Sequence, residues 1–179
     1  MQETVTEPPH HRIAESVVFA MHKHANQTRK DGRPYIVHPL RVAELLRSTG
    51  GITDTDVILA GILHDLIEDT DCEWQTIEQR FGKRVADLVS ELSGDMRLPK
   101  KERRIEQIER VRTGSAEAKA VKLADRLDNL NDMVGFSDKR KREYIAESSS
   151  VLEACRGGNS ALENALRESI ERRATAAHP

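Results

Sequence analysis

The chain has 179 residues, enough for one domain with a substantial hydrophobic core. Hydrophobic residues make up 37% of it, aromatic residues 3% and charged residues 32%, which favours a helical protein with broad polar faces over an aromatic-rich β-sandwich. A net charge of −2 excludes a strong global field that would attract nucleic acid.

Targeting and redox signals are also absent from the sequence. Residues 1–11 are polar and lack the apolar core of a signal peptide. No apolar run approaches the roughly 20 residues that a membrane helix needs. Cys72 and Cys155 do not form a CxxC pair, so neither a zinc cage nor a disulfide framework is predicted. We expect a cytoplasmic protein without a membrane or nucleic-acid partner; whether it forms a homo-oligomer is left open.

In chain order, residues 1–9 are predicted to be a flexible tail, and apolar residues then recur with helical spacing. The expected helices cover, within a few residues, 10–25, 39–46, 54–70, 73–81, 85–92, 100–108, 115–130, 139–155 and 160–173. No strand with clean alternation and no internal repeat is found. The prediction is an all-α helical bundle in a single domain, residues 10–155, with residues 156–179 forming a C-terminal helix packed on it or extending it.

Several helix starts have recognisable caps. Asp54, or Thr53 before it, is expected to cap the third helix, and Ser115 a later one. Pro39 suits the first position of a helix, which places His38 at the N-cap. Ser160 with Glu163 resembles a capping box that opens the last helix.

Residues 60–70 combine a buried-type apolar run with a histidine and three acids. On one continuous helix, His64 shares a face with Glu68, and Asp65 shares one with Asp69. Such a group on a core helix is costly unless something pairs with it, and a divalent metal bonds imidazole and carboxylate together. The alternative is an ordinary solvated helix end.

Other polar features allow two interpretations each. The loop 27–34 carries three cations, which make either a solvated turn or an anion- and base-stacking site. Asp125 lies between apolar residues and either pairs with Lys122 or Arg126 or turns inward to a metal. His38 becomes a ligand candidate only because a metal bound at His64 would need further ligands.

Four segments in order, residues 29–39, 64–70, 98–103 and 121–130, resemble the HD-domain metal phosphohydrolases, and most closely the (p)ppGpp hydrolase domain of the RelA/SpoT family. The resemblance covers about residues 10–150. The chain ends where a bifunctional member would continue into a synthetase domain. It is therefore similar to a stand-alone small alarmone hydrolase of the kind found in metazoa.

The resemblance implies an all-helical HD fold with Mn²⁺ as cofactor. The implied metal ligands are two imidazoles and two carboxylates: His38, His64, Asp65 and Asp125. Glu68 and Asp69 would handle the attacking water, which releases pyrophosphate from the 3′-diphosphate of guanosine tetra- or pentaphosphate and leaves GDP or GTP.

The resemblance also implies a substrate site. Arg29 and Lys30 would flank the guanine, and Asn129 would contact the ribose. The phosphates would be held by three further side chains: Lys100, Arg140 and Tyr144. One position departs from the family. Asp128 replaces the histidine of long bifunctional members and the tyrosine of metazoan ones, and we expect this to alter the nucleoside pocket and leave the metal site unchanged.

Two alternatives remain at this level. The first is an HD phosphohydrolase that acts on another nucleotide, such as NADPH or a dNTP; generic HD enzymes lack the loop 29–32 and the segment 98–100. The second is a non-catalytic nucleotide-binding module, which the complete ligand set and the pair Glu68 and Asp69 disfavour.

Overall fold

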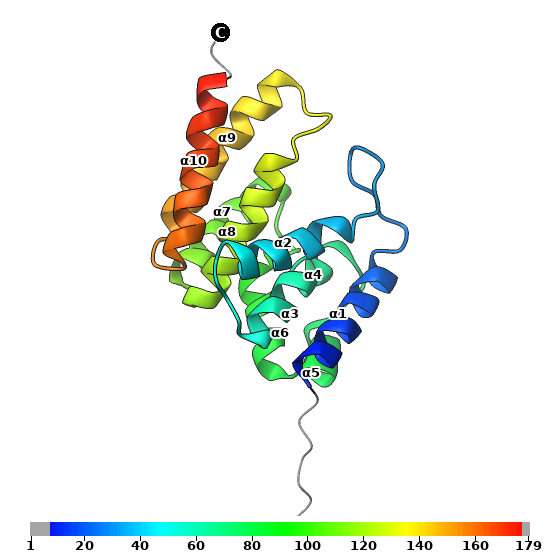
Figure 1. The fold of residues 1–179 in the computed structure, drawn as a ribbon. Coiled ribbons are helices and arrows are strands. Elements are labelled where there is room, and N and C mark those ends of the chain that lie inside the picture. Colours follow the sequence, from blue (N-terminus) through cyan, green and yellow to red (C-terminus); the bar gives the residue numbers. More distant parts are fainter. Residues whose placement is uncertain (1–7, 177–179) are drawn as a thin grey trace, which may run out of the picture.

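The structure is a computed structural model that describes residues 8–176, apart from the side chains of Lys100, Arg104 and Ala176. Its regular elements are helices, with one isolated antiparallel bridge in the loop between the first two (Figure 1). They are α1 (Pro9–Lys23), α2 (Val37–Ser48), α3 (Thr55–Leu63), α4 (Leu66–Asp69), α5 (Trp74–Phe81), α6 (Lys83–Leu92), α7 (Lys100–Thr113), α8 (Ala116–Asn131), α9 (Asp138–Ala154) and α10 (Ser160–Ala176). The expected all-α class is confirmed. Most of the predicted tail, residues 1–7, lies outside the described residues.

Helix α3 lies at the centre of the bundle. Every residue from Val57 to Leu63 is buried, and the helix contacts α1, α2, α6 and α8. This follows from its almost continuous apolar sequence, because a helix that is hydrophobic on all sides can be stable only when other elements surround it. The residues that follow α3 are therefore held in the middle of the molecule.

Gly61 allows α2 to pack closely against α3. A Cβ atom at Gly61 would lie 2.6 Å from Cδ1 of Leu46, so the buried Leu46 side chain would have to shift. The missing side chain at Gly61 lets α2 and α3 approach each other closely. Residues far apart in sequence therefore meet where α3 ends. The glycine thus has a packing role beside the histidine that follows it.

The stretch 60–70 is not one continuous helix as predicted. Helix α3 ends at Leu63, and the short α4 begins only at Leu66. Between them, Nδ1 of His64 donates to the carbonyl of Gly61 over 2.9 Å. If the helix continued, the amide of Asp65 would donate to this same carbonyl. The side chain competes with the helical hydrogen bond, so His64 and Asp65 lie in a turn.

Cap predictions were correct at two helix starts. The carboxylate of Asp54 accepts from the amide of Asp56, and the hydroxyl of Ser115 accepts from the amide of Ala118. The prediction that His38 is an N-cap was wrong, because α2 begins one residue earlier and places His38 in the first turn.

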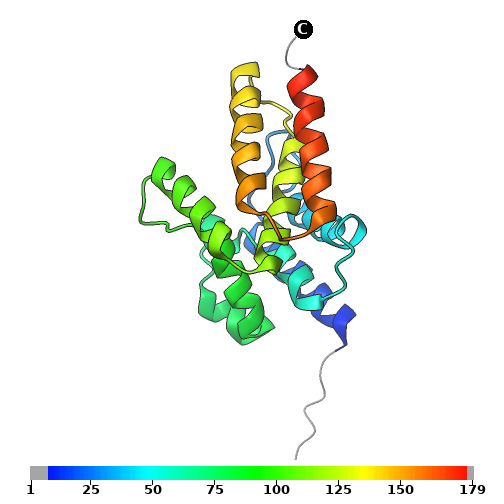
Figure 2. The same cartoon turned by 90° about the vertical axis from the view of Figure 1, so that its left-hand side faces the viewer.

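The last helix also begins differently from the prediction. Oδ1 of Asn159 accepts from the amide of Leu162 over 3.1 Å, so Asn159 takes the capping role expected of Ser160. Helix α10 then packs beside α9 and against α8 (Figure 2). Leu162 and Leu166 are fully buried and belong to the same hydrophobic core as α3. Among the described residues, no helix has both the length and the apolar character to span a bilayer.

Candidate metal centre and nucleotide cavity

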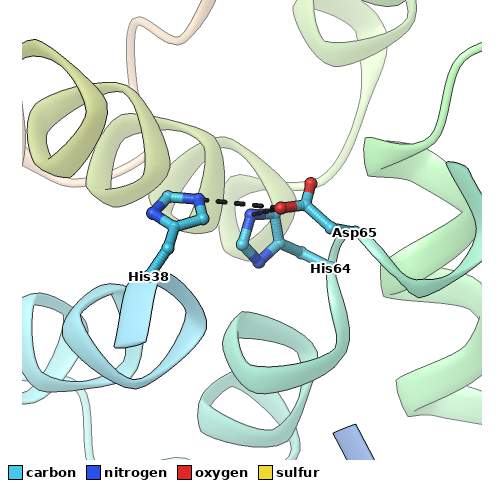
Figure 3. Close-up of side chains that lie close together, drawn as sticks. All are labelled: His38, His64 and Asp65. Carbon is cyan, nitrogen blue, oxygen red and sulfur yellow. Dashed lines mark ion pairs between the residues drawn. The ribbon is translucent and has the colours of Figure 1, made fainter. Parts of the chain in front are cut away.

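Two histidines from different helices meet at the end of α3. His38 comes from the first turn of α2 and His64 from the turn after α3, and their side chains are 1% and 3% exposed. The ring centroids are 5.2 Å apart. Both rings lie beside the carboxylate of Asp65, as Figure 3 shows. Buried imidazoles so close to a carboxylate need a proton or another cation between them.

The orientation of His64 is set by the backbone. A carbonyl can only accept, so the bond from Nδ1 to Gly61 places the ring proton on Nδ1. Nε2 then presents a lone pair. It is buried with no hydrogen-bond partner among the described residues, and it lies 3.1 Å from Oδ2 of Asp65, which is itself an acceptor. Two acceptors that face each other in a buried site favour a positive charge between them.

The ring of His38 is also held through its Nδ1, but by a side chain. Its Nδ1 lies 2.7 Å from Oδ2 of Asp128. Its Nε2 lies 3.3 Å from Oδ1 of Asp125 and 3.6 Å from Oδ2 of Asp65. The same oxygen of Asp125 lies 3.8 Å from Nε2 of His64. The structure thus gathers all four residues that the resemblance implied as ligands.

The two carboxylates are held by donors of their own. The hydroxyl of Tyr35 donates to Oδ2 of Asp65 over 2.6 Å. Lys122 lies 3.0 Å from Oδ2 of Asp125, and the amide of Asn129 donates to Oδ1 over 2.5 Å. Asp125 therefore does not form the expected surface bridge. It lies inside the protein, where one oxygen pairs with the largely buried Lys122 and the other faces the histidines.

The pKa values show how strongly this cluster attracts positive charge. Burial lowers the pKa of His38, but hydrogen bonds to Asp125 and Asp128 outweigh it and raise the pKa to about 9. Burial also lowers the pKa of His64, yet the charge of Asp65 leaves it raised. Burial raises the pKa of Asp125, but Lys122 and both histidines hold it well below its ordinary value.

These residues fit a divalent metal ion. His38, His64 and Asp65 each offer a ligand atom, and these atoms lie within 4.8 Å of one another. The unpartnered Nε2 of His64 and the attraction of the cluster for protons are what a cation site requires. Two nitrogens with carboxylate oxygens suit borderline to hard divalent ions.

The acids of α4 lie next to this centre. Oε1 of Glu68 accepts from the amide of Gly94 over 2.5 Å and from the side chain of Gln107 over 2.8 Å. Tyr35 lies 3.3 Å from Oδ2 of Asp69. Burial raises the pKa of both Glu68 and Asp69. A carboxylate with a raised pKa is a stronger base than an exposed one and can accept a proton from water.

A cavity of about 390 Å³ adjoins the cluster. Its lining includes all but one of the residues that the resemblance implied for substrate binding: Arg29, Lys30, Asn129, Arg140 and Tyr144. Tyr35 also lines it, and its hydroxyl reaches Asp65. The remaining residue, Lys100, is the first residue of α7, and its side chain lies outside the described residues.

The cations of the cavity already have partners. Arg29 donates to Asn129 over 3.0 Å, and Arg140 to Glu147 over 2.9 Å. Nζ of Lys30 lies 3.8 Å from the centre of the Phe136 ring. The loop interpretation as an anion- and base-stacking site is therefore consistent with the geometry, although a ligand would exchange with these contacts.

Sequence reasoning missed three supporting residues. Tyr35 and Gln107 had no signal, because their targets Asp65 and Glu68 lie 30 and 39 positions away in the sequence. Asp128 was assigned to the nucleoside pocket, but it contacts His38 and is not among the described residues that line the cavity. Its spacing of three residues from Asp125 on one helix places both on one face and was a usable signal.

Comparison with known proteins identifies relatives of the whole chain. Mouse guanosine-3′,5′-bis(diphosphate) 3′-pyrophosphohydrolase MESH1 is 43% identical over 169 residues, which cover 90% of this chain and 94% of that protein. The guanosine-3′,5′-bis(diphosphate) 3′-pyrophosphohydrolase of Aquifex aeolicus is 35% identical over 84% of this chain, but the match spans only 22% of that longer protein. A solved structure, described as a metazoan ortholog of SpoT that hydrolyzes ppGpp and plays a role in starvation responses, superposes with a TM-score of 0.87 at 36% identity, covering 94% of this chain and 98% of that one.

The chain also matches the family model of the HD domain, over most of its length. The match covers residues 16–155, from α1 to just past the end of α9, and includes the two histidines and the acids beside them. The chain therefore belongs to the HD domain family, in the branch that contains the MESH1 proteins.

Proposed function

We propose that this protein hydrolyses the 3′-diphosphate of guanosine tetra- and pentaphosphate, releasing pyrophosphate and GDP or GTP. One observation carries the proposal: His38, His64, Asp65 and Asp125 converge beside a cavity whose cations suit a highly phosphorylated nucleotide. The activity that names the relatives at 43% and 35% identity supports it.

The metal we propose is Mn²⁺, held by the two imidazoles and two carboxylates of the cluster. When bound, a divalent ion of this kind would polarise a phosphoryl oxygen and acidify a water molecule. Asp65 and Asp125 would supply the negative charge that retains the ion. Tyr35 and Lys122 would keep those carboxylates turned toward it through the contacts at 2.6 and 3.0 Å.

Glu68 and Asp69 orient the attacking water and take up its proton in this proposal. The oxygen of the water forms a bond to the phosphorus attached to O3′ of the ribose. The bond between that phosphorus and O3′ breaks, pyrophosphate leaves, and O3′ gains a proton. Gly94 and Gln107 hold Glu68 in one orientation through its Oε1, and its other oxygen, which has no hydrogen-bond partner among the described side chains, would face the water.

The cavity residues bind the nucleotide. Arg29 and Lys30 flank the guanine, where a guanidinium and an ammonium can contact an aromatic ring. Asn129 contacts the ribose and reaches Asp125 at the same time, so it connects the nucleotide to the metal centre. The phosphates are bound by the remaining side chains of the proposed set: Lys100, Arg140 and Tyr144. A substrate of this type is met in the cytoplasm, where we propose that the protein acts.

The test is a turnover panel with purified protein, Mn²⁺ and four nucleotides: ppGpp, pppGpp, NADPH and dGTP. We expect pyrophosphate and GDP from ppGpp, and pyrophosphate and GTP from pppGpp. Both substrates should be turned over faster than NADPH or dGTP. The control is the same protein after chelation. Equal rates with and without Mn²⁺ contradict the proposal. Faster turnover of NADPH or dGTP would instead indicate an HD phosphohydrolase for another nucleotide.

A further inference from the structure

Asp128 is a buried carboxylate that touches the metal centre without being one of its proposed ligands. It lies on α8, is 5% exposed, and its Oδ2 is 2.7 Å from Nδ1 of His38. Its other oxygen lies 3.9 Å from Arg41. It is not among the described residues that line the nucleotide cavity. Asp128 thus contacts a proposed metal ligand and does not line the proposed substrate site.

We propose that Asp128 is a positioning residue that holds His38 in the orientation and tautomer that present its Nε2 to the metal. The inference rests on the proposed metal site. An ionised carboxylate can only accept, so Asp128 keeps the ring proton of neutral His38 on Nδ1. Nε2 is then free to donate its lone pair toward the point that Asp65 and Asp125 also face.

Without Asp128, the opposite tautomer of His38 becomes favourable. Nε2 lies 3.3 Å from Asp125 and 3.6 Å from Asp65, and both oxygens are acceptors. An imidazole with its proton on Nε2 would donate to one of them and leave Nδ1 unprotonated. The neutral ring would then turn an N–H group, and no lone pair, toward the metal position, which weakens binding. A carboxylate behind a ligating histidine opposes this state and also makes the ligand nitrogen more basic.

The two histidines differ in this respect. His64 is oriented by the neutral carbonyl of Gly61 at 2.9 Å, whereas His38 is oriented by a full negative charge. The carbonyl cannot be removed by substitution, but the carboxylate of Asp128 can. The charge behind His38 is therefore a contribution of this one side chain that can be measured.

The experiment measures Mn²⁺ affinity by titration calorimetry, without substrate, in the wild-type protein, Asp128→Asn and Asp128→Leu. We expect Asp128→Leu to weaken Mn²⁺ binding about 10- to 100-fold, the usual effect of removing such a partner. Asp128→Asn keeps an acceptor oxygen but loses the charge, so its affinity falls less. The matched control is Arg41→Gln, which removes the contact on the other side of Asp128. It should leave the affinity within about twofold of the wild type.

Thermal unfolding of the metal-free variants, followed by circular dichroism, checks that they fold. If Asp128→Leu does not fold, the isosteric Asp128→Asn provides the comparison. Michaelis constants for ppGpp at saturating Mn²⁺ give a second readout. A positioning role leaves KM unchanged in Asp128→Asn, whereas a residue that shapes the nucleoside pocket raises it.

Two results overturn the inference: a folded Asp128→Asn and Asp128→Leu that both bind Mn²⁺ as tightly as the wild type, or an Arg41→Gln that loses as much affinity as they do. The first shows that His38 needs no partner, and the second that Asp128 acts through its pairing with Arg41. A wild-type protein that binds Mn²⁺ but releases no pyrophosphate refutes the proposed function alone, because the titration requires no turnover.

Discussion

The hydroxyl of Tyr35 donates to the carboxylate of Asp65 over 2.6 Å, and the same side chain lines the nucleotide cavity. Tyr35 lies in the loop between α1 and α2, whereas Asp65 follows the central helix α3. One hydrogen bond therefore joins the loop between α1 and α2, which lines the cavity, to the proposed metal centre. Its geometry shows that the two sites form one unit.

Replacing Tyr35 by phenylalanine tests this connection. The ring stays packed on His24, whose centroid is 4.7 Å away, but Asp65 and Asp69 lose a donor. We expect kcat/KM for ppGpp to fall about 10- to 150-fold, because a hydrogen bond to a charged group contributes about 1.5–3 kcal/mol. Steady-state kinetics and Mn²⁺ titration provide the measurement. Unchanged values in both would mean that the hydroxyl has no role at the site.

Metal removal should destabilise the protein as well as inactivate it. We expect Mn²⁺ to raise the unfolding temperature of chelated protein, since a ligand at 100 times its Kd stabilises the folded state by about 2.7 kcal/mol. His64→Ala and Asp125→Asn should abolish this rise together with hydrolysis. His22→Ala, an exposed histidine on α1, is the control and should retain both. Full activity in His64→Ala would disprove the site.

Glu68→Gln separates the handling of water from metal binding. The amide oxygen can still accept from Gly94 and Gln107, so the fold and the Mn²⁺ stoichiometry should be preserved. We expect kcat to fall about 100-fold or more, the usual loss for a general base. Glu73→Gln, an exposed residue before α5, should turn over like the wild type. A variant at position 68 with bound Mn²⁺ and full turnover would remove Glu68 from the mechanism.

The pH profile of kcat should show the environment of Glu68. Burial raises its pKa above the ordinary 4.5, although the amide of Gly94 opposes the shift. A base must be deprotonated to act, so activity is lost as the pH falls through this raised pKa. We expect the acid limb at saturating Mn²⁺ to lie above pH 4.5 and to change in Glu68→Gln. An acid limb that is the same in both proteins would assign it to another group.

Arg29, in the loop between α1 and α2, and Arg140, on α9, both line the cavity. Replacing either by alanine should raise KM for ppGpp about 10-fold and leave kcat within about threefold, because charged hydrogen bonds to the nucleotide are lost while the metal centre is intact. Arg156→Ala removes an exposed arginine that pairs with Glu153 and serves as the control. A fall in kcat without a rise in KM would contradict a binding role.

Local sequence patterns were sufficient for the fold class and for most helix positions. Apolar residues with helical spacing marked the helices, and the continuous apolar run 57–63 identified α3 as the buried centre. Side chains that act on their own backbone, such as the Asp54 and Ser115 caps, were predictable because the interaction spans only two or three residues. The same local logic failed at His64, where a side-chain bond to Gly61 interrupts the helix.

The residues of the stretch 60–70 already indicated a metal near His64, and the resemblance to a family then gave the full set of four proposed ligands. What the sequence could not specify is how they are held. Tyr35 reaches Asp65 across 30 positions of chain, Gln107 reaches Glu68 across 39, and His38 meets Asp128 across 90. These pairs depend on how α2, α7 and α8 pack around α3. The periodicity of each helix shows which face is buried, but the neighbour that this face meets is decided by packing, and with it the partner of every buried charge.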